Sequence, residues 1–261
     1  MAGVSLSVEG RVALITGGSR GIGAAAVRMF TAAGAQVAFN YNKAKAEADA
    51  LVSQCGAADC LALACDLSSA EAGAELVAAT VRRFGRLDIL VANHGIWVAD
   101  AVPVERMSEK QWRQTLAVDL DSVFGLIKHA VAQMKRQKKL GAGTGNIVLI
   151  SSTAGQRGEA FHCDYAAAKG ALISMVKGLS TELAPSGIRV NCVAPGWVET
   201  DMSAPALNDP ASREGIFSVI PLRRAGRPEE IAGPILFLCT EHAGFITGEV
   251  FNVNGGAVLV G

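Results

Sequence analysis

A strand that opens into a glycine-rich loop and then into a helix is the feature that most constrains the fold of this chain. Val12 to Ile15 is an unbroken apolar run, typical of a strand buried on both faces of a parallel sheet. Four glycines follow the strand: Gly17, Gly18, Gly21 and Gly23. An alanine-rich segment that favours a helix comes next and ends at Gly34. Such a helix presents free N–H groups and a positive dipole end to an anion, so the unit predicts a dinucleotide-binding site.

The spacing of these glycines leaves a second interpretation open. It is Gly-x-x-x-Gly-x-Gly, not the Gly-x-Gly-x-x-Gly of the commonest dinucleotide fingerprint. A glycine-rich turn that binds no ligand would contain the same residues. The strand before the loop, the helix after it and the position at the start of an α/β pattern favour the binding site.

The rest of the chain alternates between strand-like and helix-like segments. Strands are predicted at 36–41, 60–65, 88–92, 146–151, 188–194 and 249–253, and helices at 43–54, 71–84, 108 to about 139, 165 to about 184 and 229–240. A glycine-rich loop at 141–145 precedes the fifth strand. The alternation predicts the α/β class, as a single-domain Rossmann fold over residues 1–261 with a doubly wound parallel sheet and helices on both faces.

Residues 196–227 are the least patterned part of the chain and contain three prolines. Ligands of a doubly wound sheet bind beyond the carboxyl ends of its strands. This segment is therefore predicted to lie near the site as a substrate loop or lid. An inert surface loop is the alternative.

The composition excludes several classes of function. Half of the residues are hydrophobic and 18% are charged, which indicates extensive burial, partly between subunits. The formal net charge is zero, so there is no electrostatic footprint for nucleic acid or an anionic membrane. No apolar run reaches membrane-spanning length, and residues 1–10 lack the pattern of a secretory signal. The six cysteines lack Cys-x-x-Cys spacing, which indicates buried thiols in a reducing cytoplasm and no zinc or other metal site.

The end of the second predicted strand bears on the choice of dinucleotide. An acidic residue there, about 20 positions past the glycine loop, would hold a ribose 2′-hydroxyl and repel a 2′-phosphate. The strand instead carries Asn40, and no carboxylate appears until Glu47. Arg20 in the glycine loop can bind a phosphate as a charge-assisted fork, so NADP(H) is favoured over NAD(H). Asp66, after the third strand, is predicted to accept a hydrogen bond from the adenine amino group or to cap the next helix. A serine that follows Asp66 can also cap that helix.

A candidate catalytic group lies in the second half of the chain. Tyr165 and Lys169 are four residues apart at the start of a predicted helix and share one face. A nearby ammonium stabilises the phenolate and lowers the tyrosine pKa, as a general acid or base requires. Ser152, at the carboxyl end of the fifth strand, can hydrogen-bond a substrate oxygen. Ser151 is the competitor, because strand alternation directs only one of the two serines into the pocket.

Several motifs together resemble the short-chain dehydrogenase/reductase family. They are Thr16-Gly-Gly-Ser-Arg-Gly-Ile-Gly23, Asn93-His-Gly95, Ser152 followed by Tyr165-Ala-Ala-Ala-Lys169, Pro195-Gly196 with Thr200, the segment 220–231 and the ending 246–256. The resemblance covers residues 10–256 and is greatest for 3-oxoacyl-[acyl-carrier-protein] reductases and the related carbonyl reductases and alcohol dehydrogenases. It implies a homotetramer, with 108–139, 165–184 and the C-terminal segment as interface candidates.

The resemblance implies a role for each matching position. Tyr165 would be the general acid in reduction and the base in oxidation, Lys169 would lower its pKa and hold the nicotinamide ribose, and Ser152 would orient the carbonyl. The implied cofactor-binding positions are Gly17, Ser19, Arg20, Gly21, Ile22, Gly23, Asn40, Asp66, Leu67, Asn93, Gly95, Tyr165, Lys169, Pro195, Gly196, Val198 and Thr200.

Two positions depart from the family pattern. Asp119 stands where the family usually has an asparagine that helps to organise a proton-relay water. A relay through the backbone carbonyl survives this change, but a buried carboxylate alters the local charge, so a catalytic relay role for Asp119 is a hypothesis. His94 replaces a small residue. It either shapes the cofactor site or titrates near neutrality, or it is a tolerated loop substitution.

The sequence thus predicts an enzyme that transfers a hydride between NADPH and a carbonyl carbon, reversibly, while Tyr165 delivers the proton. The alternatives are an NAD-dependent alcohol or polyol dehydrogenase of the same family and, in another class, a non-catalytic dinucleotide-binding sensor. A sensor needs no proton donor, so the intact Ser152, Tyr165 and Lys169 oppose it.

The sequence leaves the substrate open between a 3-oxoacyl thioester and a small ketone. A thioester on an acidic carrier protein would favour a basic patch at the pocket mouth. The candidates for that patch are Arg157, Arg223, Arg224 and Arg227. Three further residues are candidates for either substrate contact or plain packing: Trp97, His162 and Trp197.

Overall fold

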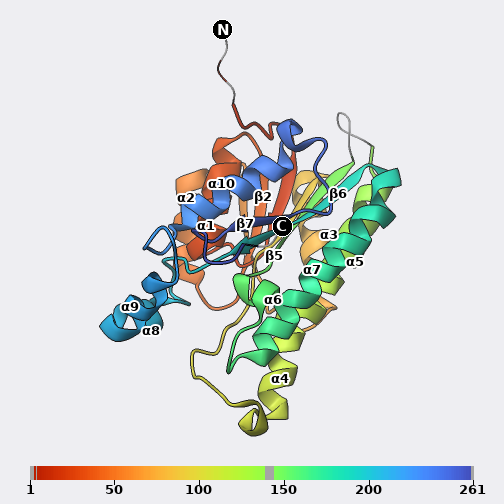
Figure 1. Cartoon of the computed structure of the whole chain (residues 1–261). Coiled ribbons are helices and arrows are strands. Elements are labelled where there is room, and N and C mark those ends of the chain that lie inside the picture. Colours follow the sequence, from red (N-terminus) through yellow and green to blue (C-terminus); the bar gives the residue numbers. More distant parts are fainter. Residues whose placement is uncertain (1–2, 4, 139–143, 260–261) are drawn as a thin grey trace.

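The computed structural model describes residues 3, 5–138 and 144–259 and contains one seven-stranded sheet between two layers of helices (Figure 1). Every strand pairs in parallel, in the order β3-β2-β1-β4-β5-β6-β7. The strands are β1 (Val12–Ile15), β2 (Gln36–Tyr41), β3 (Cys60–Ala64), β4 (Ile89–Ala92), β5 (Gly145–Ile150), β6 (Ile188–Pro195) and β7 (Val250–Val253). The predicted α/β class and single-domain Rossmann fold are confirmed.

Helices cover both faces of the sheet, as Figure 1 shows. One layer consists of α1 (Gly21–Ala32), α2 (Lys45–Cys55) and α10 (Pro228–Cys239), and the other of α3 (Ala72–Phe84), α5 (Ser122–Arg136) and α7 (Cys163–Leu183). Side chains alternate between the layers along each strand: in β1, Ile15 belongs to the core under the first layer and Leu14 to the core under the second. Burial on both faces explains why β1 is a continuous apolar run.

The order of the strands positions the site. The chain winds outward from β1 through β2 to β3, then returns to place β4 on the other side of β1. The carboxyl ends of β1 and β4 therefore flank a topological switch point, where ligands of doubly wound sheets bind. The glycine loop follows β1, and Asn93 follows β4, so both lie at this crevice.

Several local expectations need correction. The helix predicted from residue 108 onward is divided into α4 (Glu109–Leu116) and α5 by a π-helical turn, Ala117–Asp121. The segment 196–227 holds two short helices that its pattern did not reveal, α8 (Ala204–Asn208) and α9 (Pro210–Ser218), and α6 (Thr153–Arg157) was also not predicted. Residues 141–143 of the predicted glycine-rich loop lie outside the described residues.

The expected side-chain cap on α3 is wrong. The helix follows Glu71, and no side chain caps its first turn. Neither Asp66 nor the serines after it take that role.

Short 3-10 helices lie at Val104–Arg106, Ala184–Ser186 and Glu241–Ala243. Within the described ranges, no helix is both long enough and apolar enough to cross a membrane.

Candidate active site

One cavity of about 990 Å³ lies at the carboxyl ends of the central strands. All the predicted cofactor positions line it except Gly23. Gly23 lies behind the loop, where an added Cβ would collide with the carbonyl oxygen of Gly17. It therefore lets the first turn of α1 pack directly against the loop, which is what close approach to a diphosphate requires.

The start of α1 fits an anionic ligand. Arg20 is its N-cap residue, but no side chain caps the helix, so its first N–H groups stay available. The neighbouring strand is fixed to the same loop: Asn93 Nδ2 donates to the Thr16 carbonyl at 3.0 Å, and Asn93 N–H donates to Thr16 Oγ1 at 3.0 Å. The loop and the end of β4 thus form one rigid cradle of a shape and polarity suited to a dinucleotide.

Asn40 lines the cavity, but both polar atoms of its side chain hydrogen-bond to the backbone. Only 3% of its surface is exposed. Its Oδ1 accepts a hydrogen bond from the Gly17 N–H at 2.8 Å, and its Nδ2 donates to the Cys65 carbonyl at 3.0 Å. Asn40 therefore fastens the glycine loop to the end of β3.

Arg20 and Asp66 lie at the exposed rim of the cavity. Arg20 donates to Asp201 Oδ2 at 2.9 Å, which forms an ion pair between the glycine loop and the segment 196–227. Both side chains are more than half exposed, so water screens this pair strongly. Arg20 was predicted as a phosphate ligand and here has a carboxylate partner. Asp66 is exposed and lines the cavity.

The predicted catalytic side chains meet at one side of the cavity. Tyr165 and Lys169 lie on successive turns of α7, with Lys169 Nζ 5.6 Å from the centre of the tyrosine ring. Ser151 Oγ donates to the Lys169 carbonyl at 2.7 Å and so points toward α7. Ser152 Oγ instead accepts from the Ala154 N–H at 3.1 Å and lies close enough to Tyr165 to lower the pKa of the phenol. Of the two competing serines, the geometry favours Ser152.

The pKa of Tyr165 differs from the sequence expectation. Burial raises it, the ammonium of Lys169 opposes that rise, and the hydrogen bond with Ser152 also lowers it. The net direction is upward, so the phenol stays protonated at neutral pH. The lowering effect of Lys169 is present, but desolvation of the phenolate outweighs it.

Asp119 does not line the cavity but lies directly behind Lys169. It belongs to the π-helical turn, a kind of irregularity that is common at functional sites. Its Oδ1 accepts from the Ile96 N–H at 2.8 Å, and its Oδ2 is 3.3 Å from Lys169 Nζ. Burial lowers the pKa of Lys169, but Asp119 and Tyr165 raise it, and the net direction is upward. Gly95 is needed beside this pair, because a Cβ there would meet Asp119 Oδ2 at 2.9 Å.

His94 is a neutral link between two elements. Its Nδ1 lies 2.7 Å from Thr16 Oγ1, and its Nε2 lies 2.7 Å from Ser122 Oγ. Ser122 donates to the Val118 carbonyl, so it accepts from His94 Nε2–H, and Thr16 donates to Nδ1. Burial and the charge of Lys169 lower the pKa of His94 to about 3. The prediction that it titrates near neutrality is wrong, and its role in shaping the site fits the geometry.

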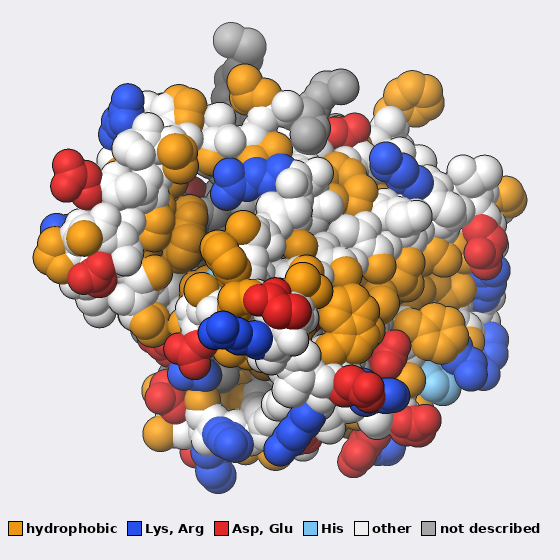
Figure 2. Space-filling view, turned by 60° about the horizontal axis from the view of Figure 1, so that its bottom comes forward, with side chains coloured by type: hydrophobic (Ala, Val, Ile, Leu, Met, Phe, Trp, Pro, Cys, Tyr) orange, Lys and Arg blue, Asp and Glu red, His pale blue; other side chains and the backbone are white. Residues whose placement is uncertain are grey.

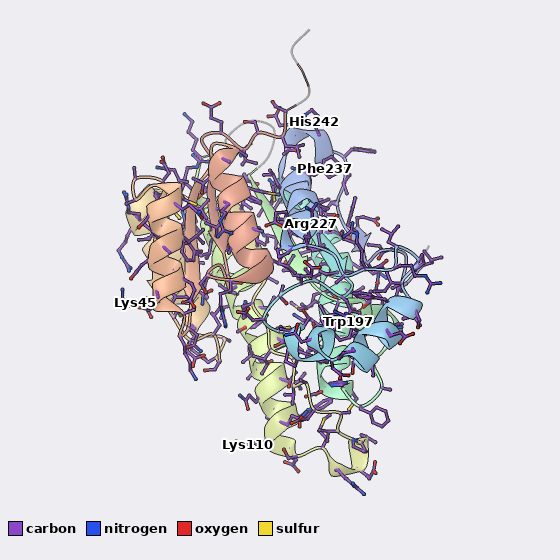
Figure 3. The ribbon with its side chains drawn as sticks, turned by 90° about the vertical axis from the view of Figure 1, so that its left-hand side faces the viewer. Lys45, Lys110, Trp197, Arg227, Phe237 and His242 are labelled. Carbon is purple, nitrogen blue, oxygen red and sulfur yellow. The ribbon has the colours of Figure 1, made fainter. Side chains whose placement is uncertain are left out.

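Two tryptophans form part of the cavity wall. Trp97 follows β4 and Trp197 follows β6, and their rings meet edge to face at 5.9 Å. Figure 3 shows Trp197 in the middle of the molecule, close to the helices of the segment 196–227. His162 does not line the cavity; it stacks on Trp97 at 5.0 Å.

The four candidate arginines do not form one basic patch. Arg224 makes two hydrogen bonds of 2.6 Å to Glu230, and Arg227 Nε lies 3.7 Å from the same carboxylate. Arg227 and Trp197 are well separated in Figure 3. Of the four, only Arg157 lines the cavity. Figure 2 shows acidic and basic side chains intermingled on the face turned forward, around hydrophobic ones.

Sequence reasoning missed several residues that organise the site. Thr16 and Ser122 hold His94, and the Ile96 N–H anchors Asp119. Thr16 had a visible signal, since it lies between the end of β1 and the first glycine of the loop. In the part of the chain that the structure describes, no three His, Cys, Asp or Glu residues are grouped to hold a metal ion, and all six cysteines are free thiols.

Comparison with known proteins shows the family. A family model described as Enoyl-(Acyl carrier protein) reductase matches residues 17–258. The 3-oxoacyl-[acyl-carrier-protein] reductase of Synechocystis is 37% identical, over 97% of this chain and 99% of the relative. The enzyme of that name from Salmonella typhimurium is 39% identical, over 98% of this chain and 100% of the relative.

Solved structures agree. A short-chain dehydrogenase/reductase of the glucose/ribitol dehydrogenase type from Brucella melitensis has a TM-score of 0.89 and 36% identity, covering 98% of this chain and 100% of its own. A blue fluorescent protein from a metagenomic library, in complex with NADPH, has a TM-score of 0.88 and 33% identity, covering 97% and 100%. The chain therefore belongs to the short-chain dehydrogenase/reductase family and is an oxidoreductase of the kind that uses a nicotinamide cofactor.

Proposed function

We propose that this protein reduces a carbonyl to a secondary alcohol, reversibly, with NADPH as the hydride donor and Tyr165 as the proton donor. The observation that carries the proposal is the meeting of Ser152, Tyr165 and Lys169 in the same cavity as the glycine loop. When bound, the nicotinamide supplies the hydride. A non-catalytic sensor has no use for this arrangement.

The side chains divide the remaining work among them. Ser152 donates a hydrogen bond to the substrate carbonyl oxygen, which polarises the bond and stabilises the charge that develops there. Tyr165 is protonated at neutral pH and gives its proton to the same oxygen. Lys169 provides the positive charge that stabilises the phenolate left behind. Asp119, through its contact with Lys169, is proposed to set the strength of that charge and to take part in proton relay.

The choice of NADP(H) over NAD(H) rests on the residues around the adenosine end. No carboxylate stands at the end of β2, and Arg20 reaches the rim of the cavity, where a 2′-phosphate can displace Asp201 from it. The structural relative in complex with NADPH supports this choice. An NAD-dependent alcohol or polyol dehydrogenase remains the alternative.

The segment 196–227 is proposed to act as a lid over the substrate. Residues at its start line the cavity, and the Arg20–Asp201 pair joins it to the glycine loop. We also propose a homotetramer in the cytoplasm. Trp112 and Phe124, in the predicted interface region, are 38% and 54% exposed, which supports a partner surface there.

The substrate is proposed to be either a 3-oxoacyl thioester or a small ketone. The curated relatives support the thioester. The four candidate arginines give the thioester little support, because two of them, Arg224 and Arg227, already interact with Glu230.

The variant Tyr165→Phe tests the proposal. We expect kcat for NADPH-dependent reduction of carbonyl compounds to fall by about 10²–10⁴-fold, because the proton donor is lost while binding surfaces remain. NADPH binding, followed by cofactor fluorescence, and the circular dichroism melting curve should stay close to wild type. Undiminished reduction by the variant contradicts the mechanism.

A further inference from the structure

The two tryptophans of the cavity form a rigid corner beside the catalytic side chains. Trp97 and Trp197 come from loops after different strands, yet their rings lie 5.9 Å apart at an angle of 86°. Tyr165 and Ser152 line the same cavity. A substrate whose carbonyl oxygen meets Tyr165 therefore places its substituents in the part of the cavity that these indoles border.

Trp97 packs against two other rings, those of Trp197 and His162. His162 stacks on its ring at 5.0 Å, with 21° between the planes. His162 is only 8% exposed and lies three residues before Tyr165 at the start of α7, so it fixes Trp97 relative to the catalytic tyrosine. Glu159 lies close enough to Trp97 for the indole to lower the pKa of its carboxyl. Because the indole N–H is the sole polar group of a tryptophan side chain, most of the surface that Trp97 offers a ligand is apolar ring.

One carboxylate, that of Glu159, lies beside this wall. Glu159 lies beside Trp97, and its Oε1 is 3.8 Å from His162 Nδ1. Burial raises the pKa of its carboxyl, although His162 and Arg157 oppose the shift. A sugar or polyol would bring several hydroxyls against the apolar faces of the two indoles, where they find no hydrogen-bond partner, and each unpaired hydroxyl weakens binding.

The charges near the cavity do not favour an acidic carrier. Arg224 and Arg227 share Glu230, and Arg20 pairs with Asp201. Lys43, Arg113 and Arg157 also line the cavity, but Arg113 pairs with Glu109 at 3.2 Å, and Glu159 lies near Arg157. A docking surface for an acidic carrier protein would instead need a set of basic side chains free of local carboxylates.

We propose that the substrate is a free ketone with an aryl or other flat apolar group on its carbonyl carbon, and that Trp97 and Trp197 select it. Two indoles at right angles give a flat group one ring to stack on and a second ring to meet at its edge, the two favourable arrangements of aromatic pairs. The corner is preorganised, so a flat group is bound without ordering the wall. This inference rests on the proposed carbonyl reduction and names its substrate class.

The test compares three carbonyl compounds with NADPH: acetophenone, 2-octanone with the same number of carbons, and acetoacetyl-coenzyme A. Wild-type kcat/KM should be highest for acetophenone, by about tenfold or more over the other two. Trp97→Ala should lower kcat/KM for acetophenone by about 10–100-fold and for 2-octanone by less than about threefold, and Trp97→Phe should restore most of the loss.

Trp112 provides the matched control. It is the third of the three tryptophans and does not line the cavity. Trp112→Phe keeps an aromatic ring at this exposed position and should leave the order of the three substrates unchanged. It also leaves Trp97 and Trp197 as the remaining tryptophans, so acetophenone added with NADP⁺ should quench the tryptophan emission of this variant, and 2-octanone should not.

The outcomes separate this inference from the proposed function. Preference for acetoacetyl-coenzyme A or 2-octanone, in a reaction that Tyr165→Phe abolishes, overturns the substrate class and leaves the carbonyl reductase intact. An equal loss on all three substrates in Trp97→Ala overturns the selective role of the corner. No reduction of any of the three by the wild type overturns both proposals.

Discussion

Lys169 Nζ lies 3.3 Å from Asp119 Oδ2, and both side chains are almost fully buried. The family pattern has a neutral asparagine at this position, so this chain places a negative charge behind the lysine that supports the catalytic tyrosine. Burial raises the pKa of the Asp119 carboxyl, whereas Lys169 and the Ile96 N–H oppose that rise, and Asp119 in turn raises the pKa of Lys169. The pair is treated as charged, because the ammonium at 3.3 Å and the Ile96 N–H both stabilise the carboxylate.

The first prediction concerns the pH dependence of alcohol oxidation, which needs the phenolate of Tyr165. Asp119 raises the pKa of Tyr165, so Asp119→Asn should lower it. The acid limb of the kcat/KM profile should therefore move to lower pH. Asp121→Asn, an exposed change on the same turn, should leave the limb in place. A limb that stays or moves upward in Asp119→Asn would show that the carboxylate does not act on Tyr165.

The second prediction separates the two adjacent serines. Ser152→Ala should reduce kcat by about 10²–10³-fold through loss of a hydrogen bond to the reacting oxygen. It should also lower stability by about 1 kcal/mol, because Ser152 caps α6. Ser151→Ala removes only the bond to the Lys169 carbonyl and should keep kcat within about tenfold of wild type. Steady-state kinetics and urea unfolding of both variants measure these effects. A larger loss of kcat in Ser151→Ala than in Ser152→Ala would assign the catalytic role to Ser151.

The third prediction concerns the ion pair at the rim. Arg20→Ala should weaken NADPH binding by about tenfold and leave NADH binding nearly unchanged, since only NADPH carries the 2′-phosphate. Asp201→Asn frees Arg20 and should strengthen NADPH binding by a few-fold, a small effect because the pair is exposed. Fluorescence titration with both cofactors measures these changes. Equal losses for NADH and NADPH in Arg20→Ala would rule out recognition of the 2′-phosphate.

The fourth prediction concerns His94 and acid stability. Its pKa is lowered to about 3 in the folded protein, whereas an unfolded histidine titrates near 6.5, so the unfolded state binds more protons between these values. Stability should therefore fall as pH falls through this window, by at most about 1.4 kcal/mol per pH unit from this residue. His94→Gln should flatten that slope and cost about 1–3 kcal/mol at pH 7 through weaker bonds to Thr16 and Ser122.

Urea unfolding between pH 4 and pH 7 measures both effects. His242→Gln, at an exposed histidine, is the control and should keep the wild-type slope. If the slope of His94→Gln equals that of the wild type, His94 does not carry the acid sensitivity.

Structure could be predicted from the sequence most reliably where local geometry permits only one kind of residue. Burial of β1 on both faces produces an unbroken apolar run, from which the strand could be predicted. The four-residue spacing of Tyr165 and Lys169 predicted that they share one face of a helix, as they do in α7. The family resemblance implied most of the cavity-lining positions, and they agree with the rule that ligands bind where the carboxyl ends of parallel strands meet. The links of His94 to Thr16 and Ser122, and of Asp119 to Lys169, join elements far apart in the chain and have no local pattern. The net pKa direction of Tyr165 also depends on burial, which spacing does not reveal.

The two bonds of Asn40 restrict how the cofactor preference of this enzyme can be re-engineered. An aspartate at this position, the usual means of recruiting NADH, would keep an acceptor for the Gly17 N–H but would turn a carboxylate oxygen toward the Cys65 carbonyl. Repulsion between the two oxygens would weaken the attachment of the glycine loop, which the Asn40→Asp substitution needs to keep intact for cofactor binding. A designer would do better to begin at Tyr41 or Asn42, which line the same cavity and follow directly in the chain.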